Sequence, residues 1–183
     1  DYVVDFNTHI LTCGSDLSKM GMLVESSNRN GVEVRNIFDL DNDVWGGGTM
    51  VGPGGGQKLS LLARYICNND LKDNDVILFT DAYDVIYLRD LDEILGRFLG
   101  FKREVIFSAE QYLWPDAAIR FPPAPTKYRY LNSGTFIGRV GEIKRMLETP
   151  IENGDDDQLY LQRAYLTGKY DVALDHEGYI FQC

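Results

Sequence analysis

Histidine and cysteine are scarce in this sequence of 183 residues, which has two histidines and three cysteines. Cys13, Cys67 and Cys183 are far apart and form no Cys-x-x-Cys pair, so neither a zinc site nor a disulfide scaffold is expected. This count leaves open whether one disulfide forms, and with it the redox compartment. No apolar run approaches the roughly 20 residues that span a bilayer, and the chain has no signal peptide and no initiator Met. We therefore expect no transmembrane segment and read the chain as a mature or excised fragment.

Basic residues are also few, with 18 Lys and Arg against 28 Asp and Glu, a formal net charge of -10. Such a surface repels phosphate backbones, which argues against nucleic acid as a partner. It does not exclude a nucleotide substrate, because a bound divalent cation reverses the local sign of a carboxylate cluster. With 44% hydrophobic residues and no linker or internal repeat, residues 1–183 are expected to form a single domain.

Short apolar runs alternate with segments of helical periodicity along the chain. This alternation predicts an α/β layered fold with a mostly parallel central sheet, in which ligands bind at the carboxyl ends of the strands. Helices are expected after a cap at Ser15 or Asp16, and over Lys58–Cys67, Leu91–Phe98, Val140–Leu147 and Asp155–Leu166. Strands are expected over His9–Thr12, Val32–Phe38, Val76–Phe79, Val105–Phe107, Thr135–Ile137 and Val172–Leu174.

Two carboxylates follow the buried strand expected at Val76–Phe79. Asp81 and Asp84, in FTDAYD, lie three residues apart across the turn that must end this strand, so their oxygens can face one point. Hard cations such as Mn²⁺ and Mg²⁺ bind oxygen ligands and leave room for substrate phosphate. The pattern therefore indicates a metal site; the alternative is a strand-end turn that uses Asp for local hydrogen bonds.

A glycine-rich segment, WGGG followed by GPGGGQK, invites comparison with phosphate-binding loops. It is not a Walker A motif, because Gln57 separates the last glycine from Lys58 and Leu59, not Ser or Thr, comes directly after the lysine. Consecutive glycines still let backbone approach a phosphate, with Lys58 at the start of a helix and Trp45 as a lid over the ligand. The alternative is a flexible surface loop.

Polar and aromatic residues follow the next expected strands. Glu110 and Trp114 suit a sugar, whose polar edges are bonded and whose apolar face is stacked; the alternative places Trp114 in the core. Asn132 begins a turn of small residues that lets backbone approach a ligand. Asp155 to Asp157 begin a helix, where acidic residues serve as caps. Three are more than capping needs, and the alternative is that the excess negative charge lies next to a metal site or faces sugar hydroxyls. His9 and His176 have no Ser or Cys partner in a triad pattern and are expected to be structural.

Seven segments together resemble the N-terminal glycosyltransferase domain of the multifunctional procollagen lysyl hydroxylases. These segments occur in the family's order and at similar spacing, over most of the chain from Trp45 to Gln182: WGGG, GGGQK, FTDAYDVI, FSAEQYLWPD, YLNSGTFIG, DDDQL and LDHEGYIFQ. The resemblance implies a GT-A type, Rossmann-like fold that binds a UDP-sugar with manganese or magnesium. It implies transfer of glucose or galactose to hydroxylysine or galactosyl-hydroxylysine of collagen, in the endoplasmic reticulum or secretory pathway. Alternatives are action on a non-collagen glycan and a non-catalytic module that binds collagen or sugar.

The resemblance also implies roles for particular residues. The family's metal ligands include a histidine further towards the C-terminus, so the third ligand is expected beyond Cys183 and the domain is expected to be truncated there. The family's hydroxylase domain, with its iron and 2-oxoglutarate site, is absent from this sequence. By position, the resemblance implies that the metal ligands are Asp81 and Asp84. It implies a donor site of Trp45, Lys58 and Tyr83, with Thr12 and Gly14 near uridine. It implies a sugar-facing and catalytic pocket of Glu110, Trp114, Asn132, Asp156 and Asp157.

Overall fold

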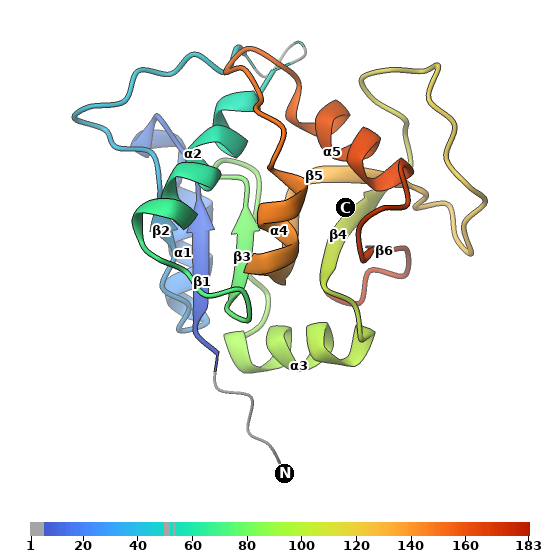
Figure 1. Cartoon of the computed structure of the whole chain (residues 1–183). Helices are drawn as coiled ribbons and strands as arrows, with labels where there is room; N and C mark the ends of the chain where they lie inside the picture. The colour runs from blue at the N-terminus through green and yellow to red at the C-terminus, as the bar shows by residue number, and fades with distance from the viewer. Residues whose placement is uncertain (1–5, 50–51, 53) are drawn as a thin grey trace.

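The computed structural model describes residues 6–49, 52 and 54–183. Their strands form one six-stranded sheet in the order β2-β1-β3-β5-β4-β6 (Figure 1). Pairing is parallel for β1 with β2, β1 with β3 and β4 with β6, and antiparallel where β5 meets β3 and β4. The mostly parallel α/β fold expected from the sequence is therefore confirmed. The strands are β1 Thr8–Thr12, β2 Arg35–Asn36, β3 Val76–Thr80, β4 Val105–Glu110, β5 Tyr130–Arg139 and β6 Val172–Asp175.

Helices cover both faces of this sheet (Figure 1). Side chains of α2, α4 and α5 pack into one apolar cluster, and side chains of α1 and α3 pack into a second one on the other face. None of the described helices is long and apolar enough to cross a membrane. The helices are the 3₁₀ turn η1 Leu17–Lys19, α1 Gly21–Arg29, α2 Gly56–Asn68, α3 Leu91–Phe101, α4 Val140–Met146 and α5 Asp157–Leu166.

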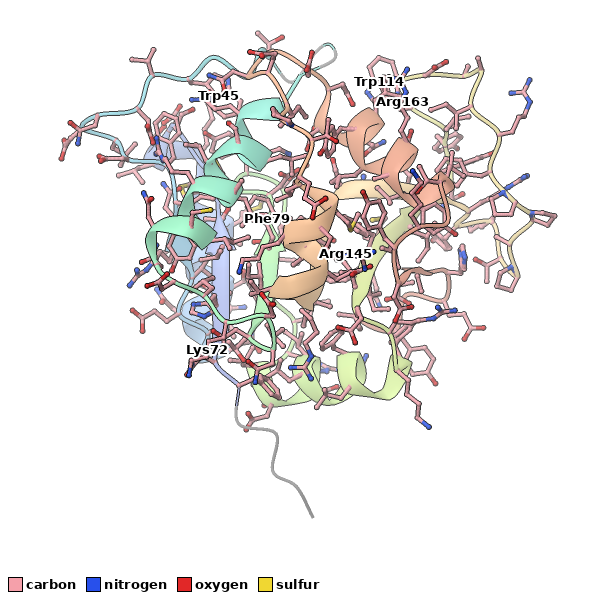
Figure 2. The ribbon with its side chains drawn as sticks, viewed as in Figure 1. Trp45, Lys72, Phe79, Trp114, Arg145 and Arg163 are labelled. Carbon is pink, nitrogen blue, oxygen red and sulfur yellow. The ribbon has the colours of Figure 1, made fainter. Side chains whose placement is uncertain are left out.

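The central strands explain why the core lies where it does. Every residue of β3 is buried, as expected for a continuous apolar run covered on both faces. Phe79 of β3 stacks on Phe136 of β5 at 5.2 Å between ring centroids, and Phe107 of β4 lies 4.9 Å from the same ring. Figure 2 labels Phe79 between α2 and α4, and its side chain belongs to the apolar cluster that these helices cover. This aromatic row holds β3, β5 and β4 together beneath the candidate site.

Three elements differ most from the sequence-based expectation. The helix expected after a cap at Ser15 or Asp16 is divided, because Asp16 caps only the 3₁₀ turn η1 and α1 begins at Gly21. The strand expected at Val32–Phe38 is reduced to two residues, because its ladder with β1 ends where the Asn36 side chain bonds both backbone groups of Gly14. The strand expected at Thr135–Ile137 extends over all of β5. Its long pairing with β4 includes a register shift between Phe107 and Ser108, which sequence periodicity does not report.

One edge of the sheet gathers most of the residues singled out from the sequence. β1, β3 and β4 end at this edge, and the antiparallel strand β5 begins there. The loop after β2 and the beginning of α5 lie along the same edge, at the top of Figure 1. Ligands of open α/β sheets bind at this position.

Candidate active site

Lys58 joins three separate elements at this edge. It lies in the first turn of α2, and its Nζ is 2.7 Å from Asp81 Oδ1, just after β3, and 2.9 Å from Asp157 Oδ2, at the start of α5. The Lys58 side chain is 13% exposed and that of Asp157 is 9% exposed. The result is a largely buried cluster of one positive and two negative charges.

The electrostatics of the cluster keep Lys58 charged and leave an excess of negative charge. Burial acts to lower the pKa of Lys58, but the charges of Asp81 and Asp157 raise it, and the net pKa lies above its ordinary value. Burial raises the pKa of Asp81, and the charge of Lys58 opposes this without reversing it. A second cation beside Asp81 would therefore be stabilised electrostatically.

An oxygen-lined space lies in front of Asp81. An ideal Cβ built on Gly134 would lie 2.9 Å from Asp81 Oδ2 and 2.9 Å from Asn132 Oδ1, so the missing side chain of this glycine keeps the space open. Asp81, Asp84 and Asn132 also line one cavity of about 570 Å³. These oxygen donors fit a hard divalent cation.

Asp81 and Asp84 alone could supply only part of the coordination shell of a metal ion. Among the described residues, no group of three or more His, Cys, Asp or Glu side chains gathers in a way that could hold a metal ion. A cation held by Asp81 and Asp84 would therefore need further oxygen ligands, such as those of substrate or water.

The glycine-rich segment is bound to the start of α5 through its backbone. The Gly54 N–H donates to Asp156 Oδ2 at 3.2 Å, while Asp156 Oδ1 caps α5 by accepting the Leu159 N–H at 2.7 Å. The Asp157 N–H donates in turn to the Gly54 carbonyl at 3.0 Å. Asp156 and Asp157, grouped together in the sequence-based hypothesis, therefore differ: Asp156 clamps the glycine segment, and Asp157 faces Lys58.

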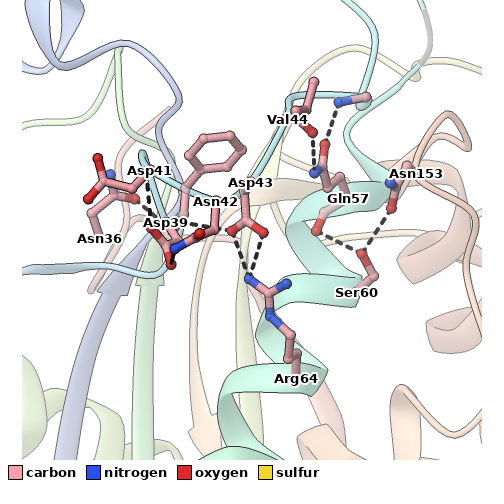
Figure 3. Close-up of polar contacts among 12 residues, drawn as sticks. Asn36, Asp39, Asp41, Asn42, Asp43, Val44, Gln57, Ser60, Arg64 and Asn153 are labelled. Atoms are coloured by element: carbon pink, nitrogen blue, oxygen red, sulfur yellow. Dashed lines mark hydrogen bonds and ion pairs between the residues drawn. The ribbon is translucent and has the colours of Figure 1, made fainter.

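Polar bonds to α2 hold the loop that carries Trp45 (Figure 3). Gln57 accepts the Gly46 N–H at 2.6 Å and donates to the Val44 carbonyl at 2.9 Å. Arg64 pairs with Asp43 at 2.7 Å. Gln57, which broke the Walker A pattern, is thus the anchor of this loop, and its role was missed from the sequence. Residues 50, 51 and 53 of the segment lie outside the described part of the chain.

The two tryptophans lie over different ends of the site edge (Figure 2). Trp45 packs against Phe38 at 6.2 Å between ring centroids, and its Nε1 donates to the Gly48 carbonyl at 2.7 Å. Trp114 is 50% exposed, which rules out the alternative that places it in the core. The structure therefore places one aromatic ring near the glycine segment and another in the loop after β4.

Glu110 ends β4 and is partly buried. Its Oε1 accepts a hydrogen bond of 2.7 Å from Gln158 Nε2 of α5, a residue that the sequence-based hypothesis did not single out. Burial raises the pKa of Glu110, and hydrogen bonds from Gln158 and Asn132 partly offset that rise. Glu110 of β4 and Asn132 of β5 thus lie within hydrogen-bond reach, although in the strand register Glu110 is opposite Tyr130 and Asn132 is opposite Ser108.

Tyr83 ties the turn of the two aspartates to the end of β1. Its hydroxyl accepts the N–H groups of Ser15 and Asp16, each at 2.9 Å. Thr12 is completely buried, and a Cβ on Gly14 would lie 2.8 Å from that of Ala82. Thr12 and Gly14 thus lie beneath this junction.

The histidines and cysteines are not part of the charge cluster. His9 Nε2 is 3.5 Å from Asp75 Oδ2, and His176 Nδ1 is 2.7 Å from the Tyr128 carbonyl, so both histidines have structural partners. The three cysteines are free, which answers the question of a disulfide.

Known proteins similar to this chain point to one family. The sequence matches the family model described as the PLOD GT domain over residues 8–183. Procollagen-lysine,2-oxoglutarate 5-dioxygenase of Drosophila melanogaster is 41% identical over 159 residues, which cover 80% of this chain and 22% of that protein. An uncharacterized protein of Acanthamoeba polyphaga mimivirus is 41% identical over 144 residues, 75% of this chain and 31% of that protein.

The name of a third relative combines a hydroxylase and a glycosyltransferase. The multifunctional procollagen lysine hydroxylase and glycosyltransferase of Caenorhabditis elegans is 32% identical over an alignment of 194 residues, with 94% of this chain and 27% of that protein covered. The chain thus spans less than a third of the length of each of these relatives. The family expected from its motifs is confirmed: this chain belongs to the PLOD GT domain family.

Proposed function

We propose that this chain is a metal-dependent glycosyltransferase that moves glucose or galactose from a UDP-sugar to hydroxylysine or galactosyl-hydroxylysine of collagen. The observation that carries the proposal is the charge cluster of Lys58, Asp81 and Asp157 beside Asp84, where the ends of three elements meet. The names of the collagen-lysine relatives support the acceptor, and with it a location in the endoplasmic reticulum or secretory pathway.

The protein's own charges suit a diphosphate leaving group. Asp81 and Asp84 would hold Mn²⁺ or Mg²⁺, and a bound cation would neutralise negative charge on the diphosphate. Lys58 stays protonated and supplies a fixed positive charge at the same place. Preorganised charge of this kind acts where negative charge develops during the reaction, which is the largest contribution in many enzymes.

The other residues would bind the nucleotide and the sugar. Trp45, Tyr83, Thr12 and Gly14 are proposed for the nucleotide side, because they lie along the glycine segment and the β1 end. The sugar side would be formed by residues at the β4 end, the β5 start and the α5 start: Glu110, Trp114, Asn132, Asp156 and Asp157. Since Asp156 already caps α5 and binds Gly54, its part in this pocket is to hold the backbone in place.

Calorimetry with UDP and Mn²⁺ tests the metal assignment. Asp84 is exposed and can lose its charge without disturbing the Lys58 cluster, so Asp84→Asn should weaken Mn²⁺-dependent UDP binding by about tenfold or more, the loss of one charged contact. Asp92→Asn is the matched control, because Asp92 is an exposed carboxylate of α3 away from the cavity. Equal binding by the two variants would show that Asp84 is not a ligand.

A UDP-release assay tests the reaction itself. UDP-glucose and UDP-galactose are each offered with collagen peptides that carry hydroxylysine or galactosyl-hydroxylysine, with and without EDTA. Cation-dependent UDP release that requires a collagen peptide supports the proposal. Release only with a non-collagen glycan would overturn the acceptor, and collagen binding without any UDP release would overturn the enzymatic function.

A further inference from the structure

Gln158 connects three segments of the candidate site through one buried side chain. It lies in the first turn of α5 and is 8% exposed. Its Nε2 donates to Glu110 Oε1 at 2.7 Å and to the Trp114 carbonyl at 2.9 Å, and its Oε1 accepts the Ser133 N–H at 3.2 Å. One amide therefore joins the end of β4, the loop that follows it and the beginning of β5.

The three partners fix the orientation of this amide. A carboxylate and a carbonyl can only accept, and a backbone N–H can only donate. A flipped amide would put oxygen against oxygen at Glu110 and Trp114, and N–H against N–H at Ser133. Gln158 therefore has one arrangement in which all its partners are satisfied, and that arrangement holds the Glu110 carboxylate in one place.

We propose that Gln158 is a positioning residue of this site, whose amide fixes the Glu110 carboxylate and the Trp114 backbone relative to each other. The inference rests on the proposed function, because Glu110 and Trp114 are the residues assigned there to the sugar. Gln158 acts through these two residues and is not itself assigned to the substrate.

Gln162 provides a matched control on the same face of α5, one helical turn further on. It is completely buried, and its Nε2 donates to the same Trp114 carbonyl at 2.9 Å and to the Leu131 carbonyl at 3.0 Å. Gln162 Nε2 thus donates to two backbone carbonyls, whereas Gln158 Nε2 also donates to a carboxylate. Comparing the two glutamines separates the bond to Glu110 from the packing of the loop.

The charged surroundings of Glu110 give the sign of the expected effect. Burial raises the pKa of the Cys183 thiol, and the charge of Glu110 adds to that rise. Tyr130 pairs with Glu110 across the strands, and Arg129 directs its guanidinium to the Pro122 carbonyl instead. Burial raises the pKa of Glu110, and the Gln158 amide opposes that rise. Losing the amide should therefore raise the pKa of Glu110 further, because the charged form loses a donor.

Fluorescence tests the inference without any need for activity. Trp45→Phe leaves Trp114 as the only tryptophan, since the sequence has two. In this background we expect Trp114 emission to show a step as Glu110 titrates, and Glu110→Gln should abolish it. Gln158→Met should remove the step or move it to higher pH, and Gln162→Met should keep it. A step that Gln158→Met leaves unchanged, or that both variants lose equally, would overturn the inference.

Kinetics on the protein with Trp45 intact give the second readout. Gln158→Met should lower kcat for UDP release by about tenfold to a hundredfold, the usual effect of misplacing a reacting group, and move the acidic limb of the rate profile to higher pH. In a protein that already carries Glu110→Gln, adding Gln158→Met should lower kcat little further, because the bond between the two residues is already lost. Adding Gln162→Met to Glu110→Gln should instead lower kcat by its full single-variant effect, and Gln162→Met alone should leave the acidic limb of the rate profile in place. If the acidic limb of the rate profile lay at the same pH in Gln158→Met and Gln162→Met, the inference would be contradicted.

Two further outcomes keep the inference separate from the proposed function. If the parent releases no UDP, the proposed function fails, while Trp114 fluorescence still decides whether Gln158 links the two segments. If Gln158→Met does not fold by circular dichroism, Gln158→Glu replaces it, with Gln162→Glu as its control. Glutamate keeps the side-chain length but, when ionised, accepts where glutamine donates.

Discussion

Removing the charge of Lys58 should cost far more stability than removing the charge of its partner Asp81. Lys58 Nζ lies 2.7 Å from Asp81 Oδ1 and 2.9 Å from Asp157 Oδ2, so one cation serves two carboxylates. Lys58→Met keeps the apolar stem but leaves two carboxylates without a cation. Asp81→Asn leaves one cation with one anion. The two variants remove members of the same pair, yet only the first leaves buried charge uncompensated.

The burial of the charge cluster determines how much stability Lys58→Met should lose. Removing one partner of a buried ion pair costs about 3–5 kcal/mol. We expect the lower end, because 29% of the Asp81 side chain reaches solvent, which screens its charge. For a chain of this length, about 3 kcal/mol lowers Tm by roughly 6–12 °C. Asp81→Asn should cost about 1 kcal/mol, the worth of one hydrogen bond.

The pH dependence follows from the direction of the pKa shift of Asp81. Burial raises this pKa above the ordinary value of 3.8, and Lys58 restrains the rise. A carboxyl whose pKa is raised by folding contributes its full stabilisation of the fold at pH values below its pKa in the unfolded chain. This stabilisation is lost as the pH rises through its pKa in the folded protein. Without Lys58 the pKa rises further, so the stability difference between parent and Lys58→Met should be smallest near pH 4 and widen towards pH 7.

Urea unfolding followed by far-ultraviolet circular dichroism, at several pH values between about 4 and 7, measures these differences. Lys144→Met is the control, because Lys144 Nζ pairs with Asp73 at 3.1 Å on the surface and should contribute less than about 0.5 kcal/mol. The reasoning is refuted if Asp81→Asn costs as much as Lys58→Met at pH 7, or if the effect of Lys58→Met is the same at every pH.

Two further predictions concern backbone and thiol groups. Gly55→Ala should destabilise the fold by at least about 2 kcal/mol, because φ of Gly55 is +90° and a Cβ there would lie 2.5 Å from a carboxylate oxygen of α5. Gly154→Ala is the control: a Cβ there would have no atom within 4 Å, so the free energy of unfolding measured in urea should change by less than about 0.5 kcal/mol. Burial raises the pKa of the Cys13 thiol to about 12, so at pH 8 iodoacetamide should label exposed Cys67 in the folded protein and Cys13 only in urea. Peptide mass spectrometry decides this, and rapid native labelling of Cys13 would contradict it.

Local periodicity was sufficient to predict most of the fold. The buried run of β3 and the helices α2 and α3 were expected within a few residues of their observed bounds, because burial of one face leaves a direct trace in the sequence. The reversed direction of β5 was not predicted. Strand direction depends on which distant strands pair, and the pairs of β5 with β3 and β4 are set by packing over the whole sheet.

Residue type predicted the candidate site less completely than the fold. Lys58, Asp81 and Asp157, which belong to three different sequence motifs, lie together because strand ends and helix starts gather at one edge. Gln57 and Gln158 were missed, although both are buried amides near helix starts. A glutamine on the apolar face of a helix needs buried partners, and that signal could have identified both before the structure was known.

The acidic run before α5 shows why composition alone misleads about such a site. Asp155 accepts the Glu152 N–H, Asp156 caps α5 and holds Gly54, and Asp157 pairs with Lys58. Three adjacent and chemically identical residues therefore have three tasks. The contacts of the last two close a ring through α5, the glycine segment and α2, so assembly of the site and folding of this edge are one event. Any loss of activity at Asp156 or Asp157 must accordingly be compared with the measured loss of stability before it is assigned to chemistry.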